Sequence, residues 1–288
     1  MKYSFVILHY NVIEETIKCI ESIKTRIKEP VNIIIVDNAS PNGSGIELLH
    51  KYENDGNIHV IINKKNIGFA NGNNIGIHYA RNVLRSDFVI VINNDTYLIQ
   101  NDFLEVIFAE WEQSHFAVMG PRIYTYYGEN QNPMPWKITN PKEVDRLLRS
   151  NLYKLIRVYV GIDSAYEKIK KIIKYIIKFK RSQLREKERL DACRQENVKL
   201  HGCCYVFSPV FFEHFDGFDS RTFMYGEEDI LYAHMKKKGL LMVYNPKLEI
   251  FHAEMVSTKS FTKSSRCLNL FRLKESRKSL KILKEVLQ

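Results

Sequence analysis

The segment DFVIVINNDTYL, Asp87–Leu98, decides the predicted fold. Its Phe88–Ile92 run is continuously apolar and mostly β-branched, which is typical of a strand buried on both faces. The run then stops abruptly at Asn93, Asn94 and Asp95. The segment therefore predicts a core strand that delivers two amides and a carboxylate to one edge of a sheet.

The composition is that of a soluble globular protein, with 45% hydrophobic and 26% charged residues among 288. No stretch reaches the roughly 18 apolar residues that a membrane-spanning helix needs. Only Lys2 precedes the first apolar strand and no small-residue cleavage site follows, so we expect no secretory signal. The formal net charge of +10 points to an anionic partner, such as nucleic acid, anionic lipid or a phosphorylated substrate.

The cysteines are odd in number and show no paired metal-binding spacing. They are Cys19, Cys193, Cys203, Cys204 and Cys267. We therefore expect free thiols in a reducing cytosol.

Strands and helices alternate through the first part of the chain. The predicted strands cover 3–10, 31–40, 57–63 and 88–95, and the predicted helices cover 14–25, 45–52 and 71–84. This alternation predicts βαβ units and an α/β fold with a mainly parallel sheet flanked by helices. Three strands end in polar clusters, HYN, VDNAS and INNDT. Because ligands bind outside the carboxyl ends of such strands, we expect these clusters to line one crevice.

The pattern changes between residues 126 and 198. A proline-containing loop is followed by a basic amphipathic stretch over 163–190, in which isoleucines recur at helical spacing among lysines. We interpret 126–198 as a helical, basic insertion in a domain covering 1–258. The tail, 259–288, is predicted to form an amphipathic helix with an apolar stripe. That stripe consists of Leu270, Leu273, Leu280 and Leu283.

Both basic helices are suited to an anionic membrane surface, which we favour. The alternative is that their apolar stripes pack on the domain. Between them, the sequence predicts a strand over 203–209, a helix that follows the acids at 227–229, and two short strands within 240–254.

Two aspartates follow buried strands. Asp95 can hold a divalent metal ion, which in turn holds a diphosphate, because Mg²⁺ and Mn²⁺ prefer oxygen ligands. The alternative is an N-cap of a helix. Asp37, in IIIVDNAS, can accept hydrogen bonds from a base imide or a ribose hydroxyl. Its alternative is turn chemistry, since DNASPNG is rich in turn formers.

Three further features carry candidate chemistry. The glycines of NKKNIGFANGNNIG permit close backbone approach to a ligand, or simply form a tight strand-to-helix turn. Glu227, Glu228 and Asp229 open a helix and raise one another's pKa, as a general base needs, although acids are common at helix N-termini. His252 follows an apolar strand and is either a packed histidine or a metal ligand.

In this order, the motifs resemble family 2 glycosyltransferases of the GT-A fold, in the bacterial rhamnosyltransferase-like branch. The matching stretches are VILHYN, IIIVDNAS, NIGFANGNNIGI, VINNDT, GCCYVFSPVFFEHFDGFDSRTFMYGEEDILYAHMKKKG and FHAEMVST. They cover most of residues 3–125 and 200–258.

The resemblance implies a role for each motif. Asp37 would contact the nucleobase of a nucleoside-diphosphate sugar of the UDP or dTDP type. Segment 66–74 would approach the ribose and diphosphate. Asp95 would bind Mn²⁺ or Mg²⁺, and His252 would complete the metal site. The residues assigned to substrate are Asp37, Asn66, Gly68, Asn71, Asn73, Asn94 and Glu227.

The base that deprotonates the acceptor is left between two acids. We lean to Asp229 because its shorter side chain points differently into the crevice, whereas a gapless alignment from FMY favours Glu228. Asn93 replaces the first acid of the family's DxD motif, so metal binding is expected to be weaker or shared with His252.

The resulting hypothesis is an inverting, metal-dependent glycosyltransferase, cytoplasmic and peripheral at the inner face of the cell membrane. It would extend a surface glycan on a lipid-linked acceptor and would bind no nucleic acid. The alternatives are a sugar nucleotidyltransferase, against which HYNVIEE after the first strand counts, and a non-catalytic protein that binds nucleotide sugars or anions.

Overall fold

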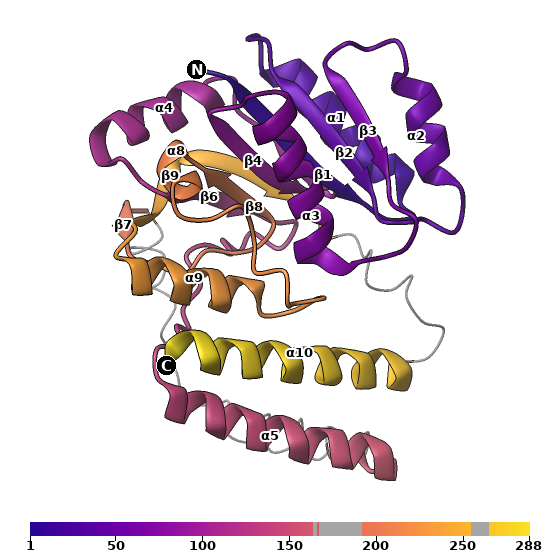
Figure 1. Cartoon of the computed structure of the whole chain (residues 1–288), viewed down its shortest axis with the longest axis vertical. Coiled ribbons are helices and arrows are strands. Elements are labelled where there is room, and N and C mark those ends of the chain that lie inside the picture. Colours follow the sequence, from indigo (N-terminus) through magenta and orange to yellow (C-terminus); the bar gives the residue numbers. More distant parts are fainter. Residues whose placement is uncertain (164–165, 167–191, 255–264) are drawn as a thin grey trace.

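The computed structural model describes residues 1–163, 166, 192–254 and 265–288. These residues form a nine-stranded mixed sheet with helices on both faces (Figure 1). The strand order is β3-β2-β1-β4-β8-β6-β9-β5, and β7 pairs with β9. The strands are β1 Tyr3–His9, β2 Asn32–Asp37, β3 Ile58–Ile62, β4 Phe88–Asn93, β5 Thr96–Leu98, β6 Val118–Tyr124, β7 Gln195–Glu196, β8 Cys204–Phe207 and β9 Met242–His252. The helices are α1 Ile13–Arg26, α2 Ser44–Tyr52, α3 Gly68–His78 with the π-helical turn Tyr79–Val83, α4 Phe103–Ser114, α5 Pro141–Val160, α8 Pro209–Phe212, α9 Glu227–Lys238 and α10 Ser265–Leu287.

The N-terminal half of the sheet confirms the predicted α/β fold. Strands β3, β2, β1 and β4 are parallel to one another. Every residue of Phe88–Ile92 in β4 is at most 1% exposed, as expected for a strand covered on both faces. Beyond β4 the sheet is mixed, because β8 runs antiparallel to β4 and β6 whereas β6 and β9 are parallel.

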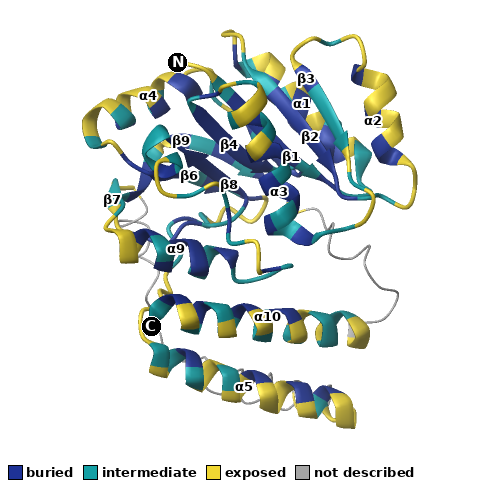
Figure 2. Ribbon diagram, in the orientation of Figure 1, coloured by how far each residue is buried: buried dark blue, intermediate teal, exposed yellow. Residues whose placement is uncertain are grey.

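Two apolar layers sandwich the sheet. Helices α1, α2 and α4 pack on one face, and α3, α8 and α9 pack on the other. Figure 2 shows the consequence, since the inner strands β1, β2, β4 and β8 are almost entirely buried whereas the helices are buried on one side only. Both layers come from the helical and strand periodicities of the sequence.

The predicted pair of short strands within 240–254 is a single strand, β9. Its pairing with β6 shifts register between Pro121 and Arg122, where the partner residue jumps from Asn245 to Glu249. Pro246 lies inside this irregular part, where a proline can be tolerated because it has no N–H to donate. The chain therefore continues past Pro246 and reaches β5 at its end.

Helices α5 and α10 form an outer layer below α9 (Figure 1). Leu283 and Val286 of α10 are buried in a cluster with Val144 of α5 and Ile230 of α9. For this end of α10 the alternative interpretation is right: the apolar stripe packs on the protein. The predicted stripe at 163–190 falls on residues outside the described part, apart from Asp163 and Tyr166. In the described part, no helix has the length and apolar character needed to cross a bilayer.

We expect Leu283→Ala to destabilise the protein by about 2–5 kcal/mol, the usual cost of emptying a buried leucine site. Urea denaturation would measure the difference. Lys281→Ala, at an exposed position of the same helix, is the control and should change the free energy of unfolding little. Equal, small effects of both substitutions would show that α10 does not pack in this way.

Candidate functional site

A cleft of about 410 Å³ opens at the carboxyl ends of the parallel strands. Its lining comes from the ends of β1, β2 and β4, the start of α3, the segment before β8 and the start of α9. The lining residues are Leu8, Tyr10, Asn38, Asn66, Phe69, Asn93, Asn94, His201, Gly202, Cys203, Met224, Tyr225, Gly226, Glu227 and Glu228. The polar clusters predicted to share a crevice do so at Tyr10, Asn38 and Asn94.

Asp95 lies in the two-residue turn that joins β4 to β5. A strand follows it, so the interpretation of Asp95 as a helix cap is wrong. Strand β5 pairs antiparallel with β9 so that Thr96 faces His252, and the Ala253 N–H donates to the Asp95 carbonyl at 2.9 Å. This register brings His252 Nε2 to 3.4 Å from Asp95 Oδ1. Both residues are 7% exposed.

Neighbouring side chains fix which nitrogen of His252 carries the proton. Gln131 donates from Nε2 to Glu254, so its Oε1 faces His252 and can only accept. His252 Nδ1 donates to that oxygen at 2.8 Å, which leaves the Nε2 lone pair directed at the Asp95 carboxylate. Two electron-rich groups so placed need a proton or a cation between them, and the pair therefore fits a divalent metal ion.

The structure also brings His201 and Cys203, which were not among the predicted site residues, close to His252. The Asn93 N–H donates to the Cys203 carbonyl at 2.8 Å, which holds the segment before β8 against the end of β4. Burial, with a smaller contribution from His252, lowers the pKa of His201 to about 4, so the ring is neutral near pH 7. The signal that could have revealed these residues is a His-x-Cys spacing immediately before a predicted strand.

The acids of α9 face different surroundings. Glu228 lines the cleft, and burial, followed by the nearby Asp229, raises the pKa of its carboxyl group. Asp229 instead accepts a hydrogen bond at 2.7 Å from Lys199, whose side chain is 5% exposed. Asp229 lines a separate cavity of about 310 Å³ between α5, α9 and α10. The ion pair occupies Asp229 and turns it away from the cleft.

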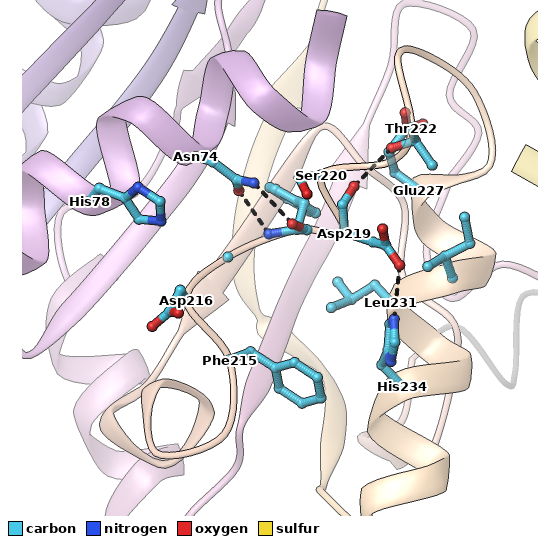
Figure 3. A pocket seen from close by; sticks show the side chains of 13 residues that line it. Asn74, His78, Phe215, Asp216, Asp219, Ser220, Thr222, Glu227, Leu231 and His234 are labelled. Atoms are coloured by element: carbon cyan, nitrogen blue, oxygen red, sulfur yellow. Dashed lines mark hydrogen bonds and ion pairs between the residues drawn. The ribbon is translucent and has the colours of Figure 1, made fainter. Parts of the chain in front are cut away.

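A second cavity of about 410 Å³ lies behind the start of α9 (Figure 3). There the Asn74 side chain exchanges two hydrogen bonds with the backbone of Phe218, and Asp219 accepts from His234 at 3.2 Å. Burial would raise the pKa of Asp219, but hydrogen bonds from Arg221 and His234 hold it well below its usual range. These contacts fix the loop that leads into α9 and thereby position Glu228.

The remaining predicted substrate residues lie around the cleft in different ways. Asn66, Asn94 and Glu227 line it. Asn71 Nδ2 donates to the Ser220 carbonyl at 2.9 Å, and Asn73 is 1% exposed and bonded to the Phe69 carbonyl. Asn71 therefore fastens α3 to the loop before α9, whereas the bond of Asn73 stays within α3.

Asp37 and Gly68 have structural partners of their own. Asp37 accepts from the backbone and hydroxyl of Ser40, which is the expected turn chemistry, and is 2% exposed. Gly68 has φ of 85° and lies against the Phe223 backbone, where a side chain would collide. The close backbone approach at Gly68 is therefore to the loop before α9. The roles of Asp37 and Gly68 in substrate binding stay predictions.

Comparisons with known proteins point in one direction. The family model described as "Glycosyl transferase family 2" matches residues 4–185, more than half of the chain. The chain is 22% identical over 247 residues to the N-acetylglucosaminyl-diphospho-decaprenol L-rhamnosyltransferase of Mycobacterium tuberculosis, covering 82% of this chain and 71% of that one. It is 28% identical over 134 residues to the low-salt glycan biosynthesis hexosyltransferase Agl10 of Haloferax volcanii, covering 46% of this chain and 40% of that one.

Among solved structures, GalNAc-T7 with UDP, GalNAc and Mn²⁺ superposes with a TM-score of 0.59 at 14% identity. The match covers 95% of this chain and 47% of that one. This likeness confirms the GT-A fold. The chain thus spans less than half the length of the hexosyltransferase and of GalNAc-T7.

Glu227 should make stability depend on pH. Burial, with Glu228 adding, raises the pKa of Glu227 to about 7 from 4.5, so the folded state holds its proton more tightly than the unfolded state. The associated stability is complete at low pH and is lost as pH rises from about 5 to about 8. Between these pH values the wild-type free energy of unfolding should fall by up to about 3 kcal/mol because of Glu227, and Glu227→Gln should remove this fall. Urea denaturation across the range measures it. Glu47→Gln, at an exposed position, should leave the slope unchanged; a Glu227→Gln curve parallel to wild type would contradict the assignment.

Proposed function

The chain belongs to glycosyl transferase family 2, and we propose that it moves a sugar from a nucleoside-diphosphate sugar to a hydroxyl of a surface-glycan acceptor, with inversion at the anomeric carbon. One observation carries the proposal. Glu228 at the start of α9 and Asn93 and Asn94 at the end of β4 line the same cleft, and Asp95, which pairs with His252, follows Asn94 in the chain.

The donor is assigned to the strand-end side of the cleft. We assign the nucleobase of a UDP- or dTDP-sugar to Asp37, and its ribose and diphosphate to segment 66–74, where Asn66 lines the cleft. Asp95 and His252 would hold the divalent cation, Mn²⁺ or Mg²⁺, which supplies charge neutralisation to the departing diphosphate. The presence of UDP and Mn²⁺ in the GalNAc-T7 structure supports this assignment.

We assign the general base to Glu228 rather than to Asp229. A base must reach the acceptor hydroxyl, and Glu228 lines the cleft whereas Asp229 is paired with Lys199. The raised pKa of Glu228 makes the carboxylate a stronger base than an exposed one. Glu228 takes the proton of the acceptor hydroxyl while the hydroxyl oxygen bonds to the anomeric carbon. At the same time the bond from that carbon to the diphosphate oxygen breaks, and the nucleoside diphosphate leaves.

The acceptor is proposed to be lipid-linked and the protein peripheral at the inner face of the cell membrane. The M. tuberculosis relative is named for a diphospho-decaprenol substrate, which supports this class. Helix α5 supports it independently. Tyr153, Ile156 and Val160 are 50–70% exposed on its surface, which also carries Arg149 and Lys154. Apolar and basic side chains side by side suit an anionic lipid surface.

The function is tested by nucleotide release from a panel of UDP- and dTDP-sugars in Mn²⁺ with a lipid-linked glycan acceptor. Glu228→Gln should lower turnover by about 10² to 10⁴, the usual effect of losing a general base. Asp229→Asn should retain most turnover but lower the melting temperature, because buried Lys199 loses its carboxylate partner.

Two results would contradict these assignments. If neither wild type nor Asp229→Asn released nucleotide with any donor, the proposed function would be wrong. If Asp229→Asn were inactive and Glu228→Gln active, the two acids would exchange roles.

The membrane assignment predicts salt-sensitive binding to vesicles that contain anionic lipid. Changing Arg146, Arg149 and Lys154 together to Glu should weaken this binding at least about tenfold, since each basic residue contributes about 1 kcal/mol. The control changes Lys28, Lys51 and Lys247, exposed residues outside α5, to Glu and alters net charge equally. Co-sedimentation measures both, and equal losses would mean that α5 is not the lipid-facing surface.

A further inference from the structure

Two chemically reactive side chains that line the cleft, His201 and Cys203, have no part in the proposed reaction. One ring nitrogen of His201, one of His252 and Sγ of Cys203 lie within 4.8 Å of one another. Asp95 Oδ1 is 3.4 Å from His252 Nε2. Two imidazoles and a thiol therefore gather at one place, and the Asp95 carboxylate lies against the His252 imidazole.

Tertiary structure alone brings these groups together. Asp95 comes from the β4–β5 turn, His252 from the end of β9, and His201 and Cys203 from the segment before β8. Cys203 lines the cleft, whereas Cys204 lies within β8, opposite Ile92 of β4, and is not among the cleft-lining residues. Cys203 lies in the turn before β8, whereas Cys204 is the first residue of that strand, so the two adjacent thiols differ in their access to the cleft.

We propose that His201 and Cys203 bind the same cation as Asp95 and His252, and that the site prefers a borderline ion of the Zn²⁺ and Co²⁺ class to Mg²⁺. The location of the cation rests on the proposed function. The preference follows from donor chemistry, because Mg²⁺ demands oxygen ligands whereas imidazole and thiolate suit Zn²⁺. On binding, the Cys203 S–H bond breaks, sulfur bonds to the metal, and the proton leaves to the buffer.

His201 can become a ligand through either ring nitrogen. Its Nδ1 accepts the Cys203 N–H at 3.2 Å, at the long end of the normal range for a hydrogen bond. A cation on Nδ1 would replace that bond, and a cation on Nε2 would need the ring proton to move to Nδ1. The second histidine is already set, since Gln131 holds its proton on Nδ1 and leaves Nε2 open.

Cobalt spectroscopy tests the proposal without any sugar substrate. The parent protein carries Cys193→Ser and Cys267→Ser, which removes the two exposed thiols. Titrated with Co²⁺, it should develop a sulfur-to-cobalt charge-transfer band in the near ultraviolet, which Zn²⁺ abolishes and excess Mg²⁺ does not. Adding Cys203→Ser should remove the band and weaken Co²⁺ binding at least about tenfold, since even changes around ligands cost about 10- to 100-fold.

Cys204→Ser is the matched control, because it changes the adjacent buried thiol and should retain the band. His201→Gln gives a second variant, in which the band should persist with weakened Co²⁺ affinity. No band in the parent, or a band lost with Cys204 rather than Cys203, would overturn the proposal. Sugar transfer without the band would support the proposed function and contradict the metal site. The band without transfer to any acceptor would support the metal site and contradict the proposed function.

Discussion

The pairing of β5 with the far end of β9 is the constraint on which the candidate site depends. The chain leaves the core strand β4 through a two-residue turn and immediately forms β5, whose partner lies 156 residues later at the Thr96–His252 pair. Backbone hydrogen bonds fix this register, and the register places Asp95 next to His252. A slip of one residue would turn His252 to the opposite face of the strand and dissolve the pair.

Charge burial sets the chemistry of the cleft. The pKa of Glu228 and that of Glu227 are raised chiefly because water is excluded around them, while Asp229, one residue further along, finds a cation in Lys199. Three adjacent acids thus receive three different environments. One is suited to take a proton, one is held between two cavities, and one forms an ion pair that fastens α9 to the segment before β8.

The outer helices differ from the expectation that two amphipathic helices both face a membrane. Leu283 of α10 is part of a protein core shared with α5 and α9, so that helix closes the structure beneath the acids. The exposed side of α5 carries apolar and basic side chains together. Helix α10 lies between α5 and α9, so this side belongs to the outermost layer of the described structure (Figure 1).

The sequence by itself determined the α/β fold and the crevice at the strand ends, because strand and helix periods and polar strand termini are local patterns. Ordered motifs likewise identified Asp95, His252 and Glu228 as candidates. The choice between Glu228 and Asp229 needed the tertiary structure, since Lys199 lies 30 residues away in sequence. The same holds for β9, which continues through Pro246 because β6 accommodates an irregular register there. His201 and Cys203 became candidate metal ligands only in three dimensions, because the pairing of β8 with β4 and of β9 with β5 brings their His-x-Cys segment next to the distant His252.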